Sequence, residues 1–272
     1  MKDIYLGTNW KMHKTISETK SYLHDLKNYL KDINFDNIKV FVIPPYTALD
    51  ITKTILKDSR ILYGAQNMHW MDEGEYTGEI SPPLLKDFEI DLIELGHSER
   101  RRYYNENDIE LNKKVKAALK YNFIPLICVG ERKEEKKYGV SQEFIKLQIK
   151  TILNGVKLND IEKELNDILW IAYEPVWAIG EKGKPATPEY IEEIHSVIRQ
   201  TLKKLYNDEI SNKIPILYGG SVNQENALSI LNQNNVDGLF IGRAAWKANS
   251  FSNIIHQVYE TFINKNSQKA NQ

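Results

Sequence analysis

The strongest constraint on the fold is an alternation, repeated about eight times, of short apolar runs with longer amphipathic segments. Apolar residues are nearly continuous within the short runs, as expected for parallel strands covered on both faces. The predicted strands are Ile4–Asn9, Val40–Ile43, Ile61–Ala65, Leu92–Leu95, Ile124–Val129, Leu169–Tyr173, Ile216–Tyr218 and Leu239–Ile241. This order predicts an α/β fold, a single (β/α)8 barrel, and leaves an open doubly wound sheet as the structural alternative.

Four amphipathic segments between these runs are predicted to be helices on the outside of the barrel. The clearest is Pro188–Tyr206, where apolar residues recur at helical spacing, Thr187 can act as N-cap and proline takes the first helical position. Ser17–Lys31, Ile109–Leu119 and Phe144–Leu153 have the same periodicity.

The 272 residues are expected to form one domain, because no linker rich in Gly, Pro or Ser interrupts the alternation. Two segments are predicted to be peripheral. Arg132–Tyr138 carries charges of both signs, which favours a solvated helix face or loop. The polar residues 265–272 are expected to be a disordered tail.

Composition restricts both the ligand and the compartment. The 36 Lys and Arg residues are balanced by 37 Asp and Glu residues, whereas duplex nucleic acids are bound by strongly basic surfaces. No apolar run approaches the roughly 18 residues needed to cross a bilayer, and the N-terminus lacks the pattern of a signal peptide. Cys128 is the single cysteine, which favours a reducing compartment. We therefore expect a cytoplasmic protein that binds a small molecule and neither nucleic acid nor membrane.

Polar residues gather directly after the predicted strands, at the end of a barrel where reactive groups are carried. The candidates are Asn9, Lys11, His97, Glu99, Glu174, Ser221, Gly242 and Arg243. Tyr173 and Trp177 flank Glu174, and an aromatic pocket would raise its pKa toward that of a general base acting near pH 7. Glycines at 219, 220 and 242 would let backbone N–H groups approach a phosphate, although tight turns would use the same residues.

Three other kinds of site are disfavoured. The six histidines lack metal-binding spacing, so neither a metal nor another cofactor is predicted. Gly180–Pro185 has the wrong spacing for a nucleotide phosphate loop, and its proline stands where such a loop has Ser or Thr. Ser221 does not lie in a Gly-x-Ser-x-Gly elbow, which disfavours a nucleophilic serine.

Taken together, the motifs resemble the signatures of the triosephosphate isomerase family, whose members are TIM barrels. They occur in family order at Asn9–Met12, Ala65–Asn67, Tyr76–Glu79, Gly96–Arg101, Cys128–Glu131, Ala172–Gly180 and Tyr218–Val222. The resemblance implies a cofactor-free aldose–ketose isomerisation of a small phosphosugar through a cis-enediolate. It also implies a place in glycolysis and gluconeogenesis.

The resemblance gives each catalytic candidate a role. Glu174 matches the base that moves a proton between adjacent carbons, and His97 matches the neutral imidazole that polarises the carbonyl. Lys11 matches a fixed positive charge, Asn9 a hydrogen-bond donor, and Glu99 a buried carboxylate behind Lys11 that has a catalytic or a structural role.

The same resemblance extends to the substrate phosphate and to the partner subunit. Pro175–Lys184 resembles a phosphate-gripping lid, and Asn9 and Lys11 would line the phosphate site. Backbone N–H groups of Gly180, Ser221 and Gly242 would bind the phosphate. Loop 67–79 resembles the interdigitating loop of family homodimers, with Thr77 reaching the neighbouring site.

The chain departs from the family pattern at the substrate end. Gly180–Pro185 is one residue longer than the usual lid sequence, Arg243 replaces a glycine, and Met68–Trp70 and Trp246 are heavier than usual. Arg243 could pair with phosphate, point into solvent or block the usual pose. These features resemble a branch acting on four-carbon phosphosugars, so an erythrulose phosphate isomerase is the alternative to a triose-phosphate isomerase. A non-catalytic phosphosugar-binding barrel and an aldolase that uses Lys11 as a Schiff-base amine are further alternatives.

Overall fold

The computed structural model describes residues 3–158, 168–180, 183 and 185–264. Its centre is a closed barrel of parallel strands in the order β1 to β8, with β8 pairing back onto β1. The strands are β1 Ile4–Asn9, β2 Ile38–Ile43, β3 Leu62–Ala65, β4 Leu92–Leu95, β5 Ile124–Val129, β6 Trp170–Tyr173, β7 Ile216–Tyr218 and β8 Gly238–Ile241. The predicted (β/α)8 TIM barrel is confirmed, and the open sheet is excluded.

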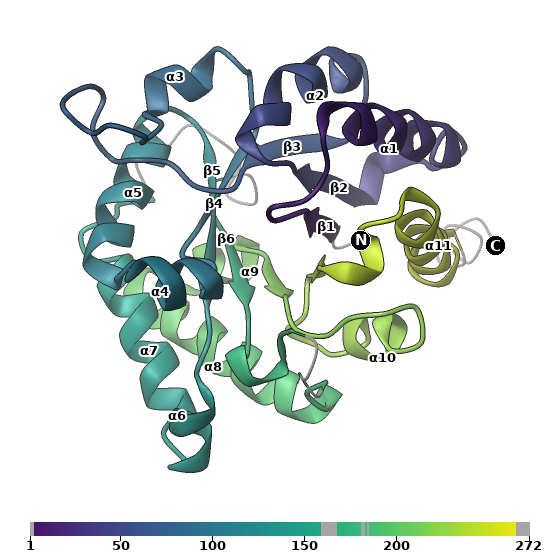
Figure 1. Cartoon of the computed structure of the whole chain (residues 1–272). Helices are drawn as coiled ribbons and strands as arrows, with labels where there is room; N and C mark the ends of the chain where they lie inside the picture. Colours follow the sequence, from purple (N-terminus) through teal and green to yellow (C-terminus); the bar gives the residue numbers. More distant parts are fainter. Residues whose placement is uncertain (1–2, 159–167, 181–182, 184, 265–272) are drawn as a thin grey trace.

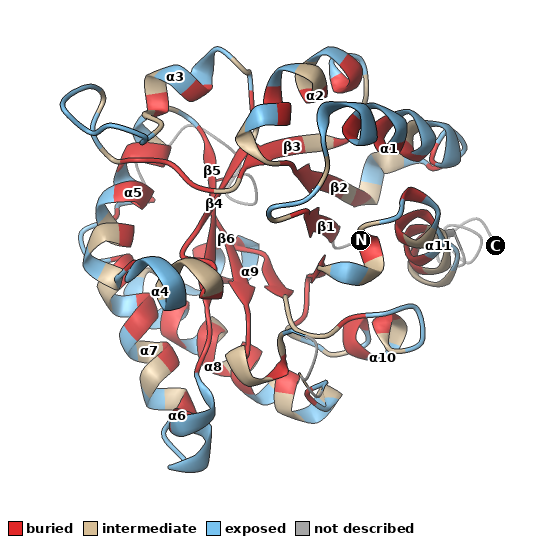
Figure 2. Ribbon diagram, viewed as in Figure 1, coloured by how far each residue is buried: buried red, intermediate tan, exposed pale blue. Residues whose placement is uncertain are grey.

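Helices surround the strands, and their faces toward the barrel are buried (Figures 1 and 2). They are α1 Ile16–Tyr29, α2 Leu49–Leu56, α3 Pro82–Lys86, α4 Ser98–Tyr104, α5 Asp108–Lys120, α6 Lys133–Lys137, α7 Ser141–Ile152, α8 Pro188–Leu205, α9 Asp208–Lys213, α10 Ala227–Leu231 and α11 Ala248–Val258. The four predicted helices correspond to α1, α5, α7 and α8, with ends that differ by a few residues. Thr187 caps α8 as expected, because its side chain accepts a hydrogen bond from the N–H of Tyr190.

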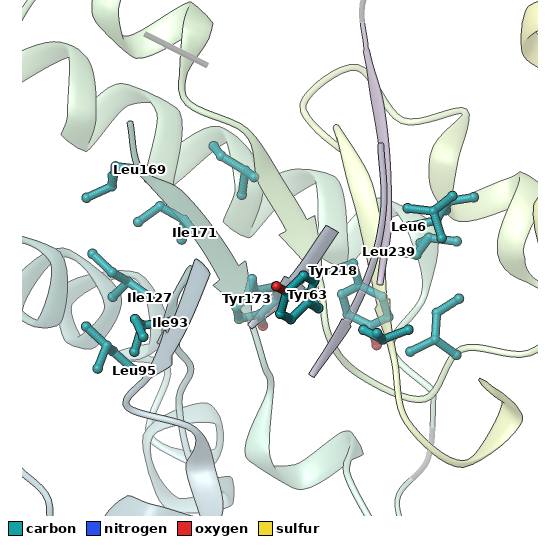
Figure 3. Close-up of a cluster of buried hydrophobic side chains, with 14 of the residues drawn as sticks. Leu6, Tyr63, Ile93, Leu95, Ile127, Leu169, Ile171, Tyr173, Tyr218 and Leu239 are labelled. Carbon is teal, nitrogen blue, oxygen red and sulfur yellow. The ribbon is translucent and has the colours of Figure 1, made fainter. Parts of the chain in front are cut away.

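Two apolar layers hold the barrel. Outward-facing strand residues such as Ile93, Ile127 and Ile171 pack under the helices (Figure 3). Inward-facing residues fill the lumen, where Trp170 contacts Tyr5 with ring centroids 5.0 Å apart and also packs on Phe41. Continuous apolar strands were therefore a correct sign of burial on both faces.

The alternation of side chains along each strand determines what lies at the C-terminal end of the lumen. Tyr5, Leu92, Leu126 and Ala172 face inward, and strand residues two or four positions later share their face. The residues that come next on this inward face are polar: Asn9, Glu94, Cys128 and Glu174. The lumen is thus apolar below and polar at the end where the βα loops begin.

The peripheral predictions have mixed outcomes. Arg132–Tyr138 contains helix α6, but it is not only a solvated face, because Glu135 is buried and the Lys136 ammonium lies 3.0 Å from the ring centroid of Trp177. The predicted tail at 265–272 lies outside the described residues. Among the described helices, none has the length and apolar character to cross a membrane.

Candidate active site

A cavity of about 540 Å³ opens beside the C-terminal ends of the strands. All the residues predicted for the site line it, although they are far apart in sequence: Asn9, Lys11, His97, Glu99, Glu174, Gly180, Ser221, Gly242 and Arg243. They follow β1, β4, β6, β7 and β8, whose carboxyl ends meet at one end of the barrel. The structure therefore brings the whole predicted set together in one cavity.

Glu174 follows β6 and is buried, with 3% of its surface exposed. Its Oε2 accepts a hydrogen bond from the N–H of Ser98 at 3.2 Å, and its Oε1 lies 3.5 Å from Nε2 of His97. Burial raises the pKa of Glu174 to about 7, although the Ser98 N–H and the charge of Lys11 favour the ionised form. A carboxyl group with this pKa can accept a proton efficiently near neutral pH.

The aromatic residues beside Glu174 contact the carboxylate of Glu131 and do not form a pocket around Glu174. Tyr173 lies on the outer side of β6, where its hydroxyl contacts the carboxylate of Glu131 at 3.0 Å. The Nε1 of Trp177 and the hydroxyl of Tyr190 donate to the same carboxylate at 2.7 and 2.9 Å. The pKa of Glu174 is raised, as predicted. The cause is the inward, buried position of Glu174 in the barrel and not the aromatic pocket that was expected.

His97 lies between β4 and α4 and is 6% exposed. Its Nδ1 accepts a hydrogen bond from the N–H of Glu99 at 3.2 Å, so the proton of the neutral ring belongs on Nε2, which faces Glu174. Burial, with the positive charges of Lys11 and Arg100, lowers the pKa of His97 to about 3. At neutral pH this side chain is an uncharged hydrogen-bond donor.

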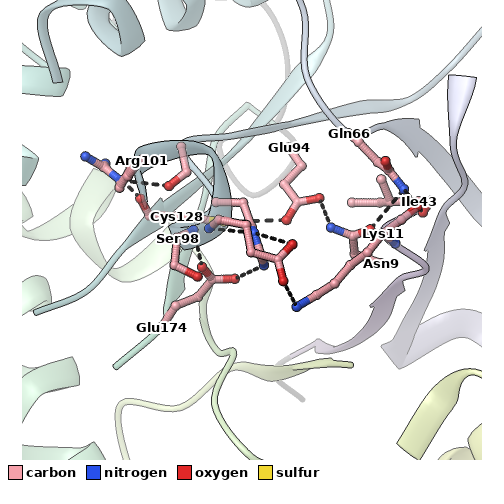
Figure 4. A network of polar contacts seen from close by, with 12 residues as sticks. Asn9, Lys11, Ile43, Gln66, Glu94, Ser98, Arg101, Cys128 and Glu174 are labelled. Carbon is pink, nitrogen blue, oxygen red and sulfur yellow. Dashed lines mark hydrogen bonds and ion pairs between the residues drawn. The ribbon is translucent and has the colours of Figure 1, made fainter. Parts of the chain in front are cut away.

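Lys11 has a backbone conformation that is uncommon for a residue with a side chain, at φ 54°. Two side chains hold it: Oδ1 of Asn9 accepts from the Lys11 N–H at 2.5 Å, and Nε2 of Gln66 donates to the Lys11 carbonyl at 2.8 Å. The Nζ of Lys11 then reaches Oε1 of Glu99 at 2.7 Å (Figure 4). The ammonium group is fixed at the cavity by contacts at both ends of the residue.

Glu99 corrects one prediction. It pairs with Lys11 as expected, but its side chain is 42% exposed and is not the buried carboxylate that the motif implied. Its position in the first turn of α4 turns it toward the cavity mouth, so the pair is solvated on the side of Glu99. The ion pair of Glu99 with Lys11 was predictable from the motif, whereas the exposure of the Glu99 side chain was not.

A glycine is required at position 219 for packing against Glu174, a role that the phosphate interpretation did not include. A Cβ atom at this position would lie 2.9 Å from Cγ of Glu174, closer than real contacts allow. Its N–H also donates to the carbonyl of Tyr173 at 2.8 Å, which continues the pairing of β6 and β7. This glycine therefore lets the base occupy its inward position.

Arg243 makes a contact that none of its predicted alternatives included. Its Nη2 donates to the carbonyl of Gly180 at 2.8 Å and so connects the loop after β8 to the lid segment. Gly180 has φ 90°, a conformation that favours glycine. The added acid of the lid, Glu181, lies outside the described residues.

Two buried groups lie beneath the cavity, of which sequence reasoning missed Glu94 and identified Cys128 only as a residue beside the site. Glu94 is fully buried, and its Oε2 accepts from Nδ2 of Asn9 at 2.6 Å. One carboxylate oxygen of Glu94, the Cys128 sulfur and one Glu174 oxygen all lie within 4.8 Å of one another, a grouping that could hold a metal ion. Burial raises the pKa of Glu94 and of Cys128, and ligands that keep their protons bind metals poorly. The sequence signal that could have identified Glu94 was a single acidic residue inside an otherwise apolar strand.

The fold and the cavity define a (β/α)8 barrel whose small-molecule site combines a buried carboxyl base with a neutral imidazole and an ammonium group. The sequence profile of the family described as "Triosephosphate isomerase" matches residues 4–258. The chain belongs to the triosephosphate isomerase family, a family of aldose–ketose isomerases.

Curated relatives carry two different names. A triosephosphate isomerase of Dictyoglomus thermophilum is 42% identical over 255 residues, which cover 94% of this chain and 99% of that protein. An L-erythrulose-1-phosphate isomerase of Mesorhizobium japonicum is 44% identical over 256 residues, covering 94% of this chain and 97% of that protein. One of the same name from Rhizobium etli is 42% identical over 256 residues, covering 94% and 92%.

The raised pKa of Glu174 generates a prediction for the pH profile. The active form of a base is ionised, so kcat/KM should be constant above about pH 7 and fall about tenfold for each pH unit below it. His97 should add no inflection in this range, because its pKa lies near 3. Initial rates in constant-ionic-strength buffers measure the profile. A flat profile through pH 7 would contradict the assignment of Glu174.

The contact of Arg243 with Gly180 generates a second prediction. Arg243→Gly should raise KM by about threefold to tenfold, because it removes a charge-assisted hydrogen bond to the lid segment. Arg243→Lys should also have a raised KM, since a lysine lacks the planar fork of donors. Lys247→Ala is the matched control, an exposed cation on the same loop that does not line the cavity. An unchanged KM in Arg243→Gly would remove Arg243 from substrate binding.

Proposed function

We propose that this protein is a triosephosphate isomerase that interconverts dihydroxyacetone phosphate and glyceraldehyde 3-phosphate through a cis-enediolate. The observation that carries the proposal is the pairing of Glu174, with a pKa of about 7, and His97, with a pKa of about 3, at 3.5 Å. A buried base beside an uncharged donor suits proton transfer at a carbon next to a carbonyl group.

In the proposed reaction, the Glu174 carboxylate removes a proton from the carbon next to the carbonyl and returns it to the adjacent carbon. The Nε2–H of His97 donates to the carbonyl oxygen and then helps to move a proton between the two oxygens. Because His97 is uncharged, it can act as an acid toward the enediolate and recover its proton in the same turnover. The reaction needs no cofactor.

Lys11 and Asn9 are proposed to stabilise the negative charge that develops on the substrate. The ammonium of Lys11 and the carboxamide of Asn9 both line the cavity, and Oδ1 of Asn9 is occupied by the Lys11 N–H and by Gln66. The amide nitrogen of Asn9 is then the group that can donate toward a substrate oxygen. Glu99 is proposed to orient the ammonium of Lys11 by their ion pair.

The phosphate is proposed to lie at the side of the cavity lined by Gly180, Ser221 and Gly242. An added Cβ would meet no atom within 4 Å at Gly180 or Gly242, so both backbones border open space that a phosphate could use. Closure of the lid at Pro175–Lys184 would exclude water and suppress loss of phosphate from the enediolate. Trp177, held by Glu131, would be a fixed end of that lid.

Isomerisation of L-erythrulose 1-phosphate is the second candidate, and it rests on two observations. Relatives with this name match the chain at 42% and 44% identity, as closely as triosephosphate isomerases do. Arg243 and Trp246, two of the departures from the family pattern, both line the cavity. The Glu174–His97 chemistry would be the same for either substrate, so the difference must lie in contacts around the sugar.

The two alternatives from other classes have less support. A Schiff-base aldolase requires a free electron pair on the Lys11 amine, but its Nζ lies in an ion pair with Glu99 at 2.7 Å. A protein that only bound phosphosugars would have no use for a buried base, whose desolvation is costly. Both observations favour an isomerase.

A direct comparison of the two substrates tests the proposal. With dihydroxyacetone phosphate and L-erythrulose 1-phosphate supplied separately, the proposal expects the higher kcat/KM for the triose phosphate. Phosphorus NMR can follow both conversions in one format. A negligible rate with the triose and a high rate with the tetrulose would identify the second candidate, and inactivity with both would reject the isomerase assignment.

Homodimerisation through loop 67–79 is also proposed. Residues 73–79 are exposed in a loop that projects beside α3 (Figures 1 and 2), and Tyr76 is 43% exposed while it packs on His69. Met12, at the cavity mouth, is 94% exposed. Exposed apolar side chains suit an interface between subunits, and Thr77 is proposed to enter the neighbouring cavity. A cytoplasmic location and a role in glycolysis and gluconeogenesis are proposed with the triose-phosphate activity.

Sedimentation equilibrium tests the proposed dimer. The parent should have about twice the chain mass of 31.6 kDa, and Tyr76→Arg should shift it toward the monomer by placing a charge in an apolar interface. Tyr138→Arg is the matched control, because Tyr138 is 72% exposed at the end of α6 and away from this loop. A monomeric parent, or equal effects of the two substitutions, would contradict the proposal.

A further inference from the structure

Glu94 occupies the layer directly beneath the active site. It follows Leu92 by two positions in β4 and faces the barrel lumen, where its exposed surface is 0%. An acid in this position needs a reason, because an ionised carboxylate without full compensation is very costly inside an apolar lumen. Its neighbours supply the reason.

The two oxygens of Glu94 have different partners (Figure 4). Oε2 accepts a hydrogen bond from Nδ2 of Asn9 at 2.6 Å. Oε1, on the other side, accepts a long hydrogen bond from the Cys128 thiol at 3.8 Å, and the same thiol also interacts with Glu174. Both hydrogen-bond partners of Glu94 are therefore neutral groups, and neither would compensate the charge of an ionised carboxylate.

The charged groups around Glu94 favour its neutral form. Burial and the nearby charge of Glu174, which follows β6, raise the pKa of Glu94 well above its usual range, and Glu99 on α4 acts in the same direction. The hydrogen bond from Asn9, the last residue of β1, and the charge of Lys11, just after this strand, oppose this. Cys128 on β5 also keeps its proton, because burial raises its pKa. Glu94 and Glu174 thus share one buried site, where a single negative charge is favoured over two, and the neutral partners of Glu94 favour a proton on that residue.

We propose that Glu94 is a positioning residue that stays protonated during turnover and orients the carboxamide of Asn9 without adding a second negative charge beside Glu174. The inference rests on the proposed function, in which Glu174 is the base and Asn9 a donor. Asn9 receives two donors at Oδ1, from Lys11 at 2.5 Å and Gln66 at 3.1 Å, and gives one N–H to Glu94. Its second N–H is then directed by three contacts rather than free to rotate.

An ionised Glu94 would oppose the reaction twice. It would place negative charge near the developing enediolate, and it would make Glu174 a stronger base that is more costly to ionise. A protonated Glu94 gives Asn9 the same acceptor oxygen without either effect. This explains why a carboxyl group can occupy a place where a charge would be harmful.

Infrared difference spectroscopy tests the protonation state directly. Spectra of the parent and Glu94→Gln are compared at about pH 8.5, where Glu174 is ionised and cannot contribute a protonated-acid signal. The parent should show the carbonyl stretch of a neutral carboxylic acid, and the variant should lack it. Absence of that band from the parent would overturn the inference. This experiment needs no substrate, so its result is separate from the success or failure of the proposed isomerase activity.

The pH profile of Glu94→Gln gives a second test. If Glu94 is neutral in the parent, glutamine replaces one neutral group by another, and the acid limb assigned to Glu174 should stay near pH 7. If Glu94 were ionised, its removal would relieve Glu174 of a negative neighbour and move the limb to lower pH. A downward shift therefore contradicts the proposal.

The action through Asn9 is tested by a double-mutant cycle. Glu94→Leu removes the acceptor and should lower kcat by about tenfold or more with a smaller change in KM, while Glu94→Gln should recover most of that loss. In an Asn9→Ala background, Glu94→Leu should have little further effect on kcat. Equal effects in both backgrounds would show that Glu94 does not act through Asn9. Thermal unfolding of each variant identifies any loss caused by misfolding.

Discussion

The site depends on the desolvation of one carboxyl group at the end of an apolar barrel. Glu174 is 3% exposed and continues the inward face of β6, so water that would stabilise its charge is largely excluded. The same exclusion acts with opposite sign on His97, because burial disfavours the charged form of any group. One environment therefore raises the pKa of a carboxyl group and lowers that of an imidazole, so that near neutral pH a Glu174 carboxylate can lie beside an uncharged His97.

This environment follows from the period of the strands. Side chains alternate between the lumen and the helices, so the residues that end the inward face of each strand meet in a single layer. Asn9, Glu94, Cys128 and Glu174 form that layer, and their side chains contact one another directly. Arg101 joins the neighbouring strand ends, since it donates to the carbonyls of Gly96 and Cys128 at 2.8 and 3.1 Å. The alternation of side chains that builds the barrel therefore also brings the residues of the site together.

Sequence reasoning was most successful where a local pattern determines the structure. The limits of β1, β4, β5 and β7 were predicted as observed, because continuous apolar runs bounded by polar residues identify buried parallel strands. It was less successful for contacts between distant segments. The exposure of Glu99 depends on where the first turn of α4 meets the cavity, and the bond from Arg243 to Gly180 joins residues 63 positions apart. Glu94 was missed because its partners, Asn9 and Cys128, are 85 and 34 positions away in sequence, and nothing local indicates the partners of one acid within an apolar run.

Relatives with two different names match the chain at similar identity, and the proposed Glu174–His97 chemistry would serve either substrate, so substrate choice would be controlled by other contacts. A triose and a tetrulose phosphate have the same phosphate and the same enediol carbons, and they differ by one hydroxylated carbon. A hydroxyl group is discriminated well only when a buried polar group would otherwise be unpaired. The deeper site already pairs its polar groups internally, through Glu94, Gln66 and Glu99. Discrimination should therefore come from the cavity wall, where Arg243 is engaged with the lid carbonyl and Trp246 packs on His13 with ring centroids 4.3 Å apart.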